Sequence, residues 1–521
     1  MKITAQLILA SAPARFRPEK AQGLLKIFHF IIRGDEEFSW TLEIRNGVCL
    51  LHQALIGDAN CTVTTTAKTY IELETGKANP QFALMTGKVK VSHLTEMMAF
   101  SKCFRKFDVS YINEERSSPV VSGRSKPERS GPLSGLTIMD FTRLLPGPMA
   151  TMLLAGMGAD VIKVEDQDAP DYVRTFEPML GDQSAFYYAL NTDKRSLAIN
   201  FLKPQGREVL LKVLERCDVL VEQFRPGVMA RFGLDYDTLK DLFPKLIYVS
   251  ITGYGQQSVL AQAAGHDLNY IATSGLLGMN GTAERPVIPG FQVADVAGGA
   301  YMAMNAVLAA LYQRERTGKG DFVDVAMTDA VLPLLALPFA AYQATGEISR
   351  RESFQLSGGL ANYNVYICSD GKFLAIGALE PKFWSAICEK LQKPEWEDAL
   401  LSGVDAHDQI KAALGQLLKE KTSAEWLAFF EGSDCCVSLV NDLSMLEHDP
   451  YLVGRDLFAT FDLEGKAFKT IRQPLKFSSA KSGSPMIAPK LGEDTFALLR
   501  EAGFTDAEIG EMNGKVIWCS N

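Results

Sequence analysis

Three polar side chains in the second half of the chain have the chemistry needed for proton transfer. They are His266, Asp295 and Glu380, in the segments Gly265-His266-Asp267-Leu268-Asn269-Tyr270, Val293-Ala294-Asp295-Val296-Ala297-Gly298-Gly299 and Gly377-Ala378-Leu379-Glu380-Pro381. Imidazole and carboxylate groups are common general acids and bases near neutral pH. A histidine and a carboxylate on opposite faces of one carbon atom could remove a proton from one face and return it to the other.

Each of the three residues also has a simpler explanation when it is considered alone. An aspartate before a helix is most often only a cap, a lone histidine is more often structural, and a glutamate before a proline often lies at the surface. The elements that would position them therefore have to be considered.

Length and composition predict a soluble protein of two or three domains. The chain has 521 residues, of which 47% are apolar and 22% charged, and its net charge of −9 is spread without a long basic block. That charge argues against a nucleic-acid partner.

The nine cysteines are scattered, with neither disulfide nor zinc spacing, so we expect reduced thiols, no metal site and a cytoplasmic location. No apolar run approaches 18 residues, so no membrane span is predicted.

A linker divides the chain. Residues 113–132 are rich in Ser, Pro, Gly and charge and have no apolar periodicity. We therefore expect an N-terminal domain over residues 1–112, a linker over 113–133 and a second domain over 134–521. Residues 1–14 weakly imitate a signal peptide, but polar Thr4 and Gln6 interrupt the apolar stretch.

The N-terminal domain is predicted to be α+β. Residues 38–44 and 48–55 have the pattern of two strands around the turn Asn46-Gly47, and residues 61–65 that of a third. A helix over 67–75 should end at Gly76, and residues 94–104 have helical periodicity. The segments 58–63, 73–80 and 83–91 resemble the sterol-carrier-protein-2-like lipid-binding domain. That resemblance implies an apolar tunnel for acyl chains or their CoA esters, whereas the simpler alternative is that these residues only fill a small core.

After the linker, strands and helices alternate. Residues 137–141, 148–156 and 160–165 predict a strand–helix–strand unit, and the pattern repeats through a helix over 206–216 and strands over 218–222 and 246–252. Alternation of this kind predicts a doubly wound, Rossmann-like α/β sheet. Gly156-Met157-Gly158 lies after a helix and before a strand, which is the wrong order for a dinucleotide site.

From residue 132 to the end, the chain resembles the family III CoA-transferases and racemases, the CaiB/BaiF group, and within it the α-methylacyl-CoA racemases. The resemblance implies a large domain over about 134–335 plus a C-terminal return, a smaller α+β domain over about 355–475, and an interlocked homodimer with its site between the two domains. It is carried by residues 136–148, 158–165, 193–197, 221–228 and 316–320, together with the three segments described first. The short glycine run at Ser357-Gly358-Gly359 also favours the racemases.

Matched position by position, the resemblance makes His266, Asp295 and Glu380 the catalytic residues. His266 and Asp295 would each serve one face of the α-carbon, and Glu380 would orient the imidazole. Asp295 directly precedes the amphipathic residues 296–314 and is a predicted helix N-cap. Gly298, Gly299 and Ala300 should leave the first turn bare for a thioester, and backbone N–H groups near Asp295 should stabilise the enolate oxygen. The reaction would need no cofactor, because CoA is part of the substrate.

The resemblance also suggests a set of CoA contacts. Asp166 stands where racemases often carry a basic residue, which puts the phosphate contacts of that loop in question. The alternative for the charged candidates is ordinary surface charge. The candidates are Leu144, Leu145, Lys194, Arg195, Phe224, Arg225 and Arg231.

Three functions remain open from the sequence. The first is racemisation of 2-methylacyl-CoA thioesters, with the N-terminal domain holding a lipid or delivering substrate. The second is CoA transfer between carboxylic acids through an acyl and CoA adduct on Asp295, which gives His266 and Glu380 no necessary role. The third is non-catalytic binding of lipid or acyl-CoA, against which the intact polar trio argues.

Overall fold

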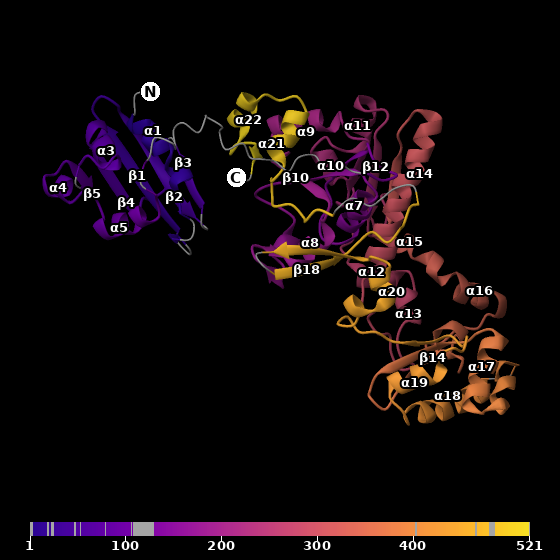
Figure 1. The fold of residues 1–521 in the computed structure, drawn as a ribbon. Coiled ribbons are helices and arrows are strands. Elements are labelled where there is room, and N and C mark those ends of the chain that lie inside the picture. The colour runs from indigo at the N-terminus through magenta and orange to yellow at the C-terminus, as the bar shows by residue number, and fades with distance from the viewer. Residues whose placement is uncertain are drawn as a thin grey trace. The chain divides into compact units, whose positions relative to one another are not determined.

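The chain forms two compact units, Met1–Val120 and Val121–Asn521 (Figure 1). The predicted turn Asn46-Gly47 and most of the predicted linker lie outside the described residues. The computed structural model describes residues 4–17, 20–21, 25–45, 48–52, 54–78, 80–105, 107, 130–401, 404–463, 466–478 and 485–519.

The N-terminal unit is a five-stranded sheet with helices, in the strand order β3-β2-β1-β4-β5. The patterns did not identify the central strand β1, because its run Leu-Lys-Ile-Phe-His-Phe-Ile-Ile-Arg is apolar on both faces and lacks clean alternation. Its Phe28, Phe30 and Ile32 are buried in the core of the unit. The elements are α1 (Ala5–Ala10), α2 (Ala12–Arg15), β1 (Leu25–Arg33), β2 (Phe38–Arg45), β3 (Val48–His52), β4 (Cys61–Thr66), α3 (Ala67–Glu74), α4 (Pro80–Met85), β5 (Val89–Val91) and α5 (Leu94–Lys102).

The segment that imitates a signal peptide is part of this core. Thr4 caps α1 by accepting the N–H of Leu7 at 3.2 Å, and Ile8 and Leu9 are fully buried. Burial of these side chains accounts for the apolar character of the segment.

The second unit contains the predicted doubly wound sheet, in the strand order β13-β12-β11-β6-β7-β10-β19. The first six of these strands are parallel, and β19 pairs antiparallel with β10 as the chain returns at its C-terminal end. The strands are β6 (Thr137–Asp140), β7 (Asp160–Glu165), β10 (Lys194–Ile199), β11 (Val219–Glu222), β12 (Ile247–Thr252), β13 (Phe322–Ala326) and β19 (Ile517–Trp518).

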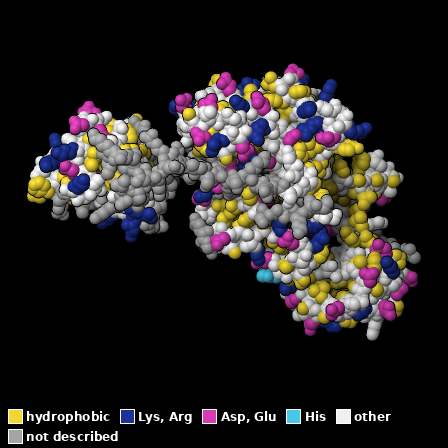
Figure 2. All heavy atoms as spheres, turned by 45° about the horizontal axis from the view of Figure 1, so that its top comes forward, with side chains coloured by type: hydrophobic (Ala, Val, Ile, Leu, Met, Phe, Trp, Pro, Cys, Tyr) yellow, Lys and Arg dark blue, Asp and Glu magenta, His cyan; other side chains and the backbone are white. Residues whose placement is uncertain are grey.

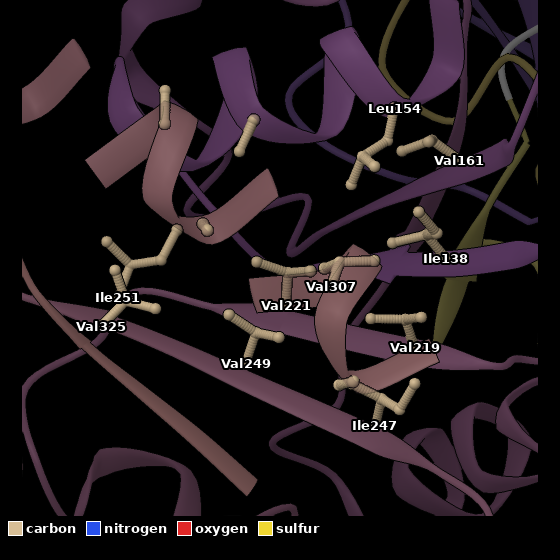
Figure 3. Packing of buried hydrophobic residues seen from close by; sticks show 14 of the residues in the cluster. Ile138, Leu154, Val161, Val219, Val221, Ile247, Val249, Ile251, Val307 and Val325 are labelled. Atoms are coloured by element: carbon tan, nitrogen blue, oxygen red, sulfur yellow. The ribbon is translucent and has the colours of Figure 1, made fainter. Parts of the chain in front are cut away.

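Two apolar clusters cover the two faces of this sheet. Figure 3 shows one face, where Ile138, Val161 and Val219 of the strands meet Leu154 of α7 and Val307 of α14. On the other face, α9, α11, α21 and α22 pack against the alternate side chains of the same strands. The helices are α7 (Pro146–Gly156), α8 (Ala185–Leu190), α9 (Pro204–Leu214), α10 (Val228–Arg231), α11 (Tyr236–Leu242), α12 (Asp267–Thr273), α13 (Leu276–Met279), α14 (Met302–Thr317), α15 (Met327–Ala330), α16 (Ala336–Thr345), α21 (Thr495–Glu501) and α22 (Asp506–Met512).

One continuous helical segment, Ala294–Thr317, is long and apolar enough by length and composition to cross a membrane, and it stands alone in this among the described residues. In the fold, its Ala300, Ala303 and Val307 are fully buried in the core beside the sheet. It combines the π-helix η3 (Ala294–Tyr301) with α14.

A smaller α+β part has its own core, which extends from Ala361 to Leu439. Its sheet has the order β14-β15-β16, and its helices pack on one face. The later hairpin, which we expected in this part, instead packs against the large part, with the Phe468 ring 6.0 Å from that of Tyr188. The elements are β14 (Tyr363–Ile367), β15 (Phe373–Gly377), α17 (Pro381–Leu391), α18 (Val404–Leu418), α19 (Ser423–Phe430) and β16 (Val437–Leu439), followed by α20 (Pro450–Gly454), β17 (Phe458–Leu463) and β18 (Lys466–Ile471).

Beneath the end of β6 lies a buried ion pair between Lys194 and Asp140, with an Nζ–Oδ2 distance of 3.1 Å and no solvent exposure of either side chain. Removing one partner of such a pair leaves an uncompensated charge in the core. We expect Lys194→Met to lower the free energy of unfolding by about 3–5 kcal/mol, measured by urea denaturation. The matched control is Lys240→Met, which breaks an exposed pair with Asp237 and should change stability little. Equal effects of the two substitutions would contradict the structural role of Lys194.

Candidate active site

The segment around His266 is a tightly constrained turn into a helix. His266 precedes α12 as its N-cap, and its backbone N–H donates to Asn269 Oδ1 at 3.1 Å. The Tyr270 hydroxyl donates to the Gly265 carbonyl at 2.5 Å. A Cβ atom on Gly265 would lie 2.7 Å from the Tyr270 ring, which explains the glycine. These contacts hold the backbone of His266 and leave its side chain exposed.

Asp267 joins this segment to the helix that carries Asp295. Its Oδ1 accepts the backbone N–H groups of Ala294 at 2.6 Å and of Asp295 at 3.0 Å. The first N–H groups of a helix have no partner within the helix, so a carboxylate there satisfies both hydrogen bonding and the helix dipole. His266 and Asp295 are thereby brought to one junction, although they are far apart in the sequence.

The prediction that Asp295 is a helix N-cap is wrong. The helix begins at Ala294, and Asp295 is the second residue of the π-helix η3. The amides of Ala294 and Asp295 already donate to Asp267, and that of Val296 donates to the Gln292 carbonyl at 3.1 Å. The predicted enolate donors near Asp295 are therefore occupied at these three positions.

The glycines of this helix serve packing and do not leave an open surface for a thioester. Gly298 and Gly299 are buried. A Cβ atom on Gly298 would lie 2.7 Å from the Met327 carbonyl oxygen, and one on Gly299 would lie 2.6 Å from Pro146 Cβ. Their small size allows η3 to approach α15 and α7 closely, which corrects the expectation of a bare first turn.

Asp295 has the electrostatic environment of a group that exchanges protons near neutral pH. Burial and, second, the negative charge of Asp267 raise the pKa of Asp295 to about 7. Tyr270 lies beside it, and its pKa is raised to about 12 by burial first and then by Asp295. A carboxyl group that titrates near pH 7 can accept and donate a proton under the same conditions.

The structure places Glu380 in the smaller part of the unit. It is exposed, it precedes α17 as its N-cap, and its charge acts on Cys436. Within the described part of the chain, no hydrogen bond or ion pair joins Glu380 to His266. Within one chain, Asp267 therefore links the segments that carry His266 and Asp295, whereas Glu380 lies on a different element.

Several predicted CoA-binding residues lie at the carboxyl ends of the neighbouring strands β6 and β11. Leu144, with φ +61°, donates its N–H to Asp171 Oδ1 at 3.1 Å, and Leu145 is the N-cap of α7. Phe224 follows β11 and donates its N–H to Glu222 at 2.7 Å. Exposed Arg225 lowers the pKa of Tyr270 by its charge, so it lies near Tyr270.

Arg231 is the last residue of the short helix α10 and is also exposed. The contact of Arg231 with a CoA phosphate therefore stays a prediction. Its position after the β11 loop is compatible with the other candidates at this end of the sheet.

Lys194 and Arg195 are structural, which corrects their prediction as CoA contacts. Lys194 is fully buried and donates to Asp140, to the Pro148 carbonyl and to Asn191. Arg195 is 1% exposed and pairs with Asp160 at 2.6 Å and Glu501 at 2.7 Å. Both cations begin the buried strand β10, which the patterns did not identify.

Asp267 and Tyr270 are two site residues whose roles the sequence patterns do not reveal. Both belong to the motif that contains His266, so their signal was present there. Their roles depend on partners outside the motif, namely the first turn of η3 and the carboxyl group of Asp295.

Comparison with known proteins identifies the family. Residues 133–495 match CoA-transferase family III, and residues 7–101 match the SCP-2 sterol transfer family. The chain belongs to CoA-transferase family III. It carries an SCP2 domain before the family III domain.

Relatives within family III include both racemases and transferases. The chain is 33% identical to human alpha-methylacyl-CoA racemase over 390 residues, covering 75% of this chain and 98% of the relative. It is 32% identical to human succinyl-CoA:glutarate CoA-transferase over 392 residues, covering 73% and 88%. A solved CAIB/BAIF family protein from Brucella suis superposes with a TM-score of 0.63 at 30% identity, covering 72% of this chain and all of that one. Identity alone therefore does not distinguish the two reactions.

Asp267→Asn separates the two effects of this carboxylate on Asp295. Asparagine keeps an oxygen acceptor for the two backbone N–H groups but removes the negative charge. Because a like charge raises the pKa of a carboxyl group, we expect the pKa of Asp295 to fall below its value of about 7, while burial still raises it above the ordinary range. The measurement is a carbon-13 NMR titration of labelled aspartates, with the Asp295 signal assigned by its loss in Asp295→Asn.

The matched control for this titration is Asp235→Asn, a capping aspartate at the start of α11. It should leave the titration of Asp295 unchanged. An unchanged Asp295 titration in Asp267→Asn would contradict the electrostatic coupling.

Proposed function

We propose that the family III domain is a racemase/epimerase that interconverts (2R)- and (2S)-2-methylacyl-CoA thioesters. The observation that carries the proposal is the junction at Asp267, which ties the turn at His266 to the first turn at Asp295. Two acid/base groups at one site are what a reaction requires when a proton leaves one face of a carbon atom and returns to the other.

The reaction proceeds through an enolate. One group removes the α-proton, and the electrons of the broken C–H bond move into the thioester carbonyl. The other group then donates a proton to the opposite face of the α-carbon, which restores the carbonyl with inverted configuration. In one direction Asp295 is the base and the His266 imidazolium is the acid, and in the other direction the roles are exchanged.

The environment of Asp295 supports this use over nucleophilic attack. A nucleophilic carboxylate must be ionised, whereas a pKa of about 7 keeps part of the population protonated at neutral pH. CoA transfer through an adduct on Asp295 remains the second candidate, since a succinyl-CoA:glutarate CoA-transferase is similar to the same degree. That reaction gives no necessary role to His266.

We further infer that the site is completed by a second copy of the chain. The segment that leads to the smaller part carries an extensive exposed apolar surface, which a monomer would leave in water, and Figure 2 shows hydrophobic side chains gathered there. Surfaces of this kind mark protein interfaces. An interlocked homodimer would cover this surface and bring Glu380 of one protomer to His266 of its partner. The exposed residues are Leu332, Leu334, Leu337, Phe339, Tyr342 and Ile348.

The SCP2 domain points to an apolar substrate. We propose that it binds a lipid or acyl chain and raises the local concentration of acyl-CoA near the family III domain.

The cytoplasm is the compartment that the free cysteines favour.

Incubation of one enantiomer of a 2-methylacyl-CoA in deuterated water tests racemisation. We expect deuterium at the α-carbon together with formation of the epimer, both followed by NMR. Asp295→Asn and His266→Ala should each slow epimer formation by about 100-fold or more, the usual contribution of a general acid or base. Asp506→Asn, which alters an exposed first-turn aspartate of α22, is the control.

Absence of both α-deuterium and epimer would contradict the proposal. Trapping of an acyl adduct on Asp295 with hydroxylamine, with CoA exchange that depends on an added carboxylic acid, would instead assign CoA transfer.

Co-expression of His266→Ala and Glu380→Ala chains tests whether the site is shared. If Glu380 comes from the partner, each mixed dimer has one intact site, and random assembly should restore about a quarter of wild-type activity. Each variant alone should be nearly inactive. Inactive mixed dimers would place the site within one chain. Glu389→Ala, an exposed change on α17, should remain fully active by itself.

A further inference from the structure

The sheet has one topological switch point, between β6 and β11. From β6 the chain builds β7 and β10 on one side, and it then returns to build β11, β12 and β13 on the other. In open α/β sheets, ligands bind outside the carboxyl ends of the strands at such a point. The residues that follow β6 and β11 are therefore placed to contact a ligand.

Arg143 spans this switch point. It follows β6, and its guanidinium carbon lies 5.5 Å from the centre of the Phe224 ring, which follows β11. Its Nη2 donates to the Ala169 carbonyl at 3.0 Å. The side chain therefore connects three loops at the carboxyl edge of the sheet while remaining partly exposed.

Gln223 fixes the backbone of Arg143. Its Nε2 donates to the Arg143 carbonyl at 2.6 Å, and its Oε1 accepts the N–H of Gly147 at 3.1 Å. A Cβ atom on Gly147 would lie 2.5 Å from that Oε1, so the clamp requires glycine at this position. The loop that presents Arg143 is thus held by contacts that do not use its charge.

The charge of Arg143 is not neutralised by the part of the chain that the structure describes, where no carboxylate oxygen lies within 4.0 Å of it. Arg174 and Arg195 differ, because both are buried against carboxylates. Asp166, which stands where racemases often carry a basic residue, is buried and accepts the N–H of Asp168 at 2.9 Å. Arg143 reaches the same loop at Ala169 and places a cationic group beside it.

We propose that Arg143 binds a phosphate group of the CoA moiety, in place of a cation at position 166. Guanidinium groups suit this task, because they remain charged and present forked donors to phosphate oxygens. The proposal rests on a CoA thioester as the substrate, but it holds for racemisation and for CoA transfer alike.

Calorimetric titration of the full chain with CoA, dephospho-CoA and pantetheine tests the proposal. Arg143→Gln keeps a polar side chain and removes the charge. We expect it to raise the Kd for CoA about tenfold or more, the effect of losing a charged hydrogen bond, and to leave the Kd for pantetheine unchanged. A higher Kd for CoA alone would show that Arg143 contacts the 3′-phosphate. A higher Kd for both CoA and dephospho-CoA would show that it contacts the pyrophosphate.

Arg316→Gln is the matched control, since Arg316 also lies over an aromatic ring, 5.8 Å from that of Tyr312. It should bind all three ligands as the wild type does. The proposal would be overturned if Arg143→Gln left the Kd for CoA unchanged, or if it raised the Kd for pantetheine by the same factor as the Kd for CoA. CoA binding is measured without turnover, so a failure of racemisation leaves this test unaffected.

Discussion

The hydrogen bonds from the first turn of η3 to Asp267 are the constraint on which the candidate site depends. Each is a bond between a backbone N–H and a charged carboxylate, a class worth about 1.5–3 kcal/mol. Their positions fix the start of the helix against the turn at His266. The same negative charge also raises the pKa of Asp295, second to burial, so one residue holds the junction together and affects the protonation of Asp295.

Small residues allow η3 to pack closely, and buried charged groups hold the neighbouring loop after β6. Gly298 and Gly299 allow η3 to lie against α15 and α7, and a larger side chain at either would meet backbone or proline atoms. Beneath the end of β6, Asp140 accepts hydrogen bonds from Lys194, Thr142 and Thr151, all buried. This network anchors the loop that carries Arg143 and Leu144 to the rigid sheet. At the carboxyl edge of the sheet, the charges of Lys194 and Asp140 are thus buried and paired, whereas that of Arg143 is partly exposed.

Racemisation and CoA transfer by family III proteins place different demands on one aspartate. A nucleophile must be ionised and accessible to the thioester carbon, whereas an acid/base group must change protonation during each turnover. In this chain, half-burial and a neighbouring carboxylate both favour the protonated form of Asp295. His266 precedes Asp267 at the same junction and is the second acid/base group of the proposed reaction. These two features are the basis of the proposed racemisation, because overall identity is nearly the same for the two kinds of relative.

Much of the large sheet could be predicted because buried parallel strands are short apolar runs that alternate with helices, as at β6, β7, β11 and β12. The strand β10 was missed because Lys194 and Arg195 at its start resemble surface charge, and only their burial against Asp140, Asp160 and Glu501 reveals it.

The sequence by itself determined the residue types of the site, His266 and Asp295, and the family to which the chain belongs. Only the tertiary structure decided their surroundings, because the Asp267 bridge, the burial that raises the pKa of Asp295 and the separate position of Glu380 all arise from contacts between segments distant along the chain.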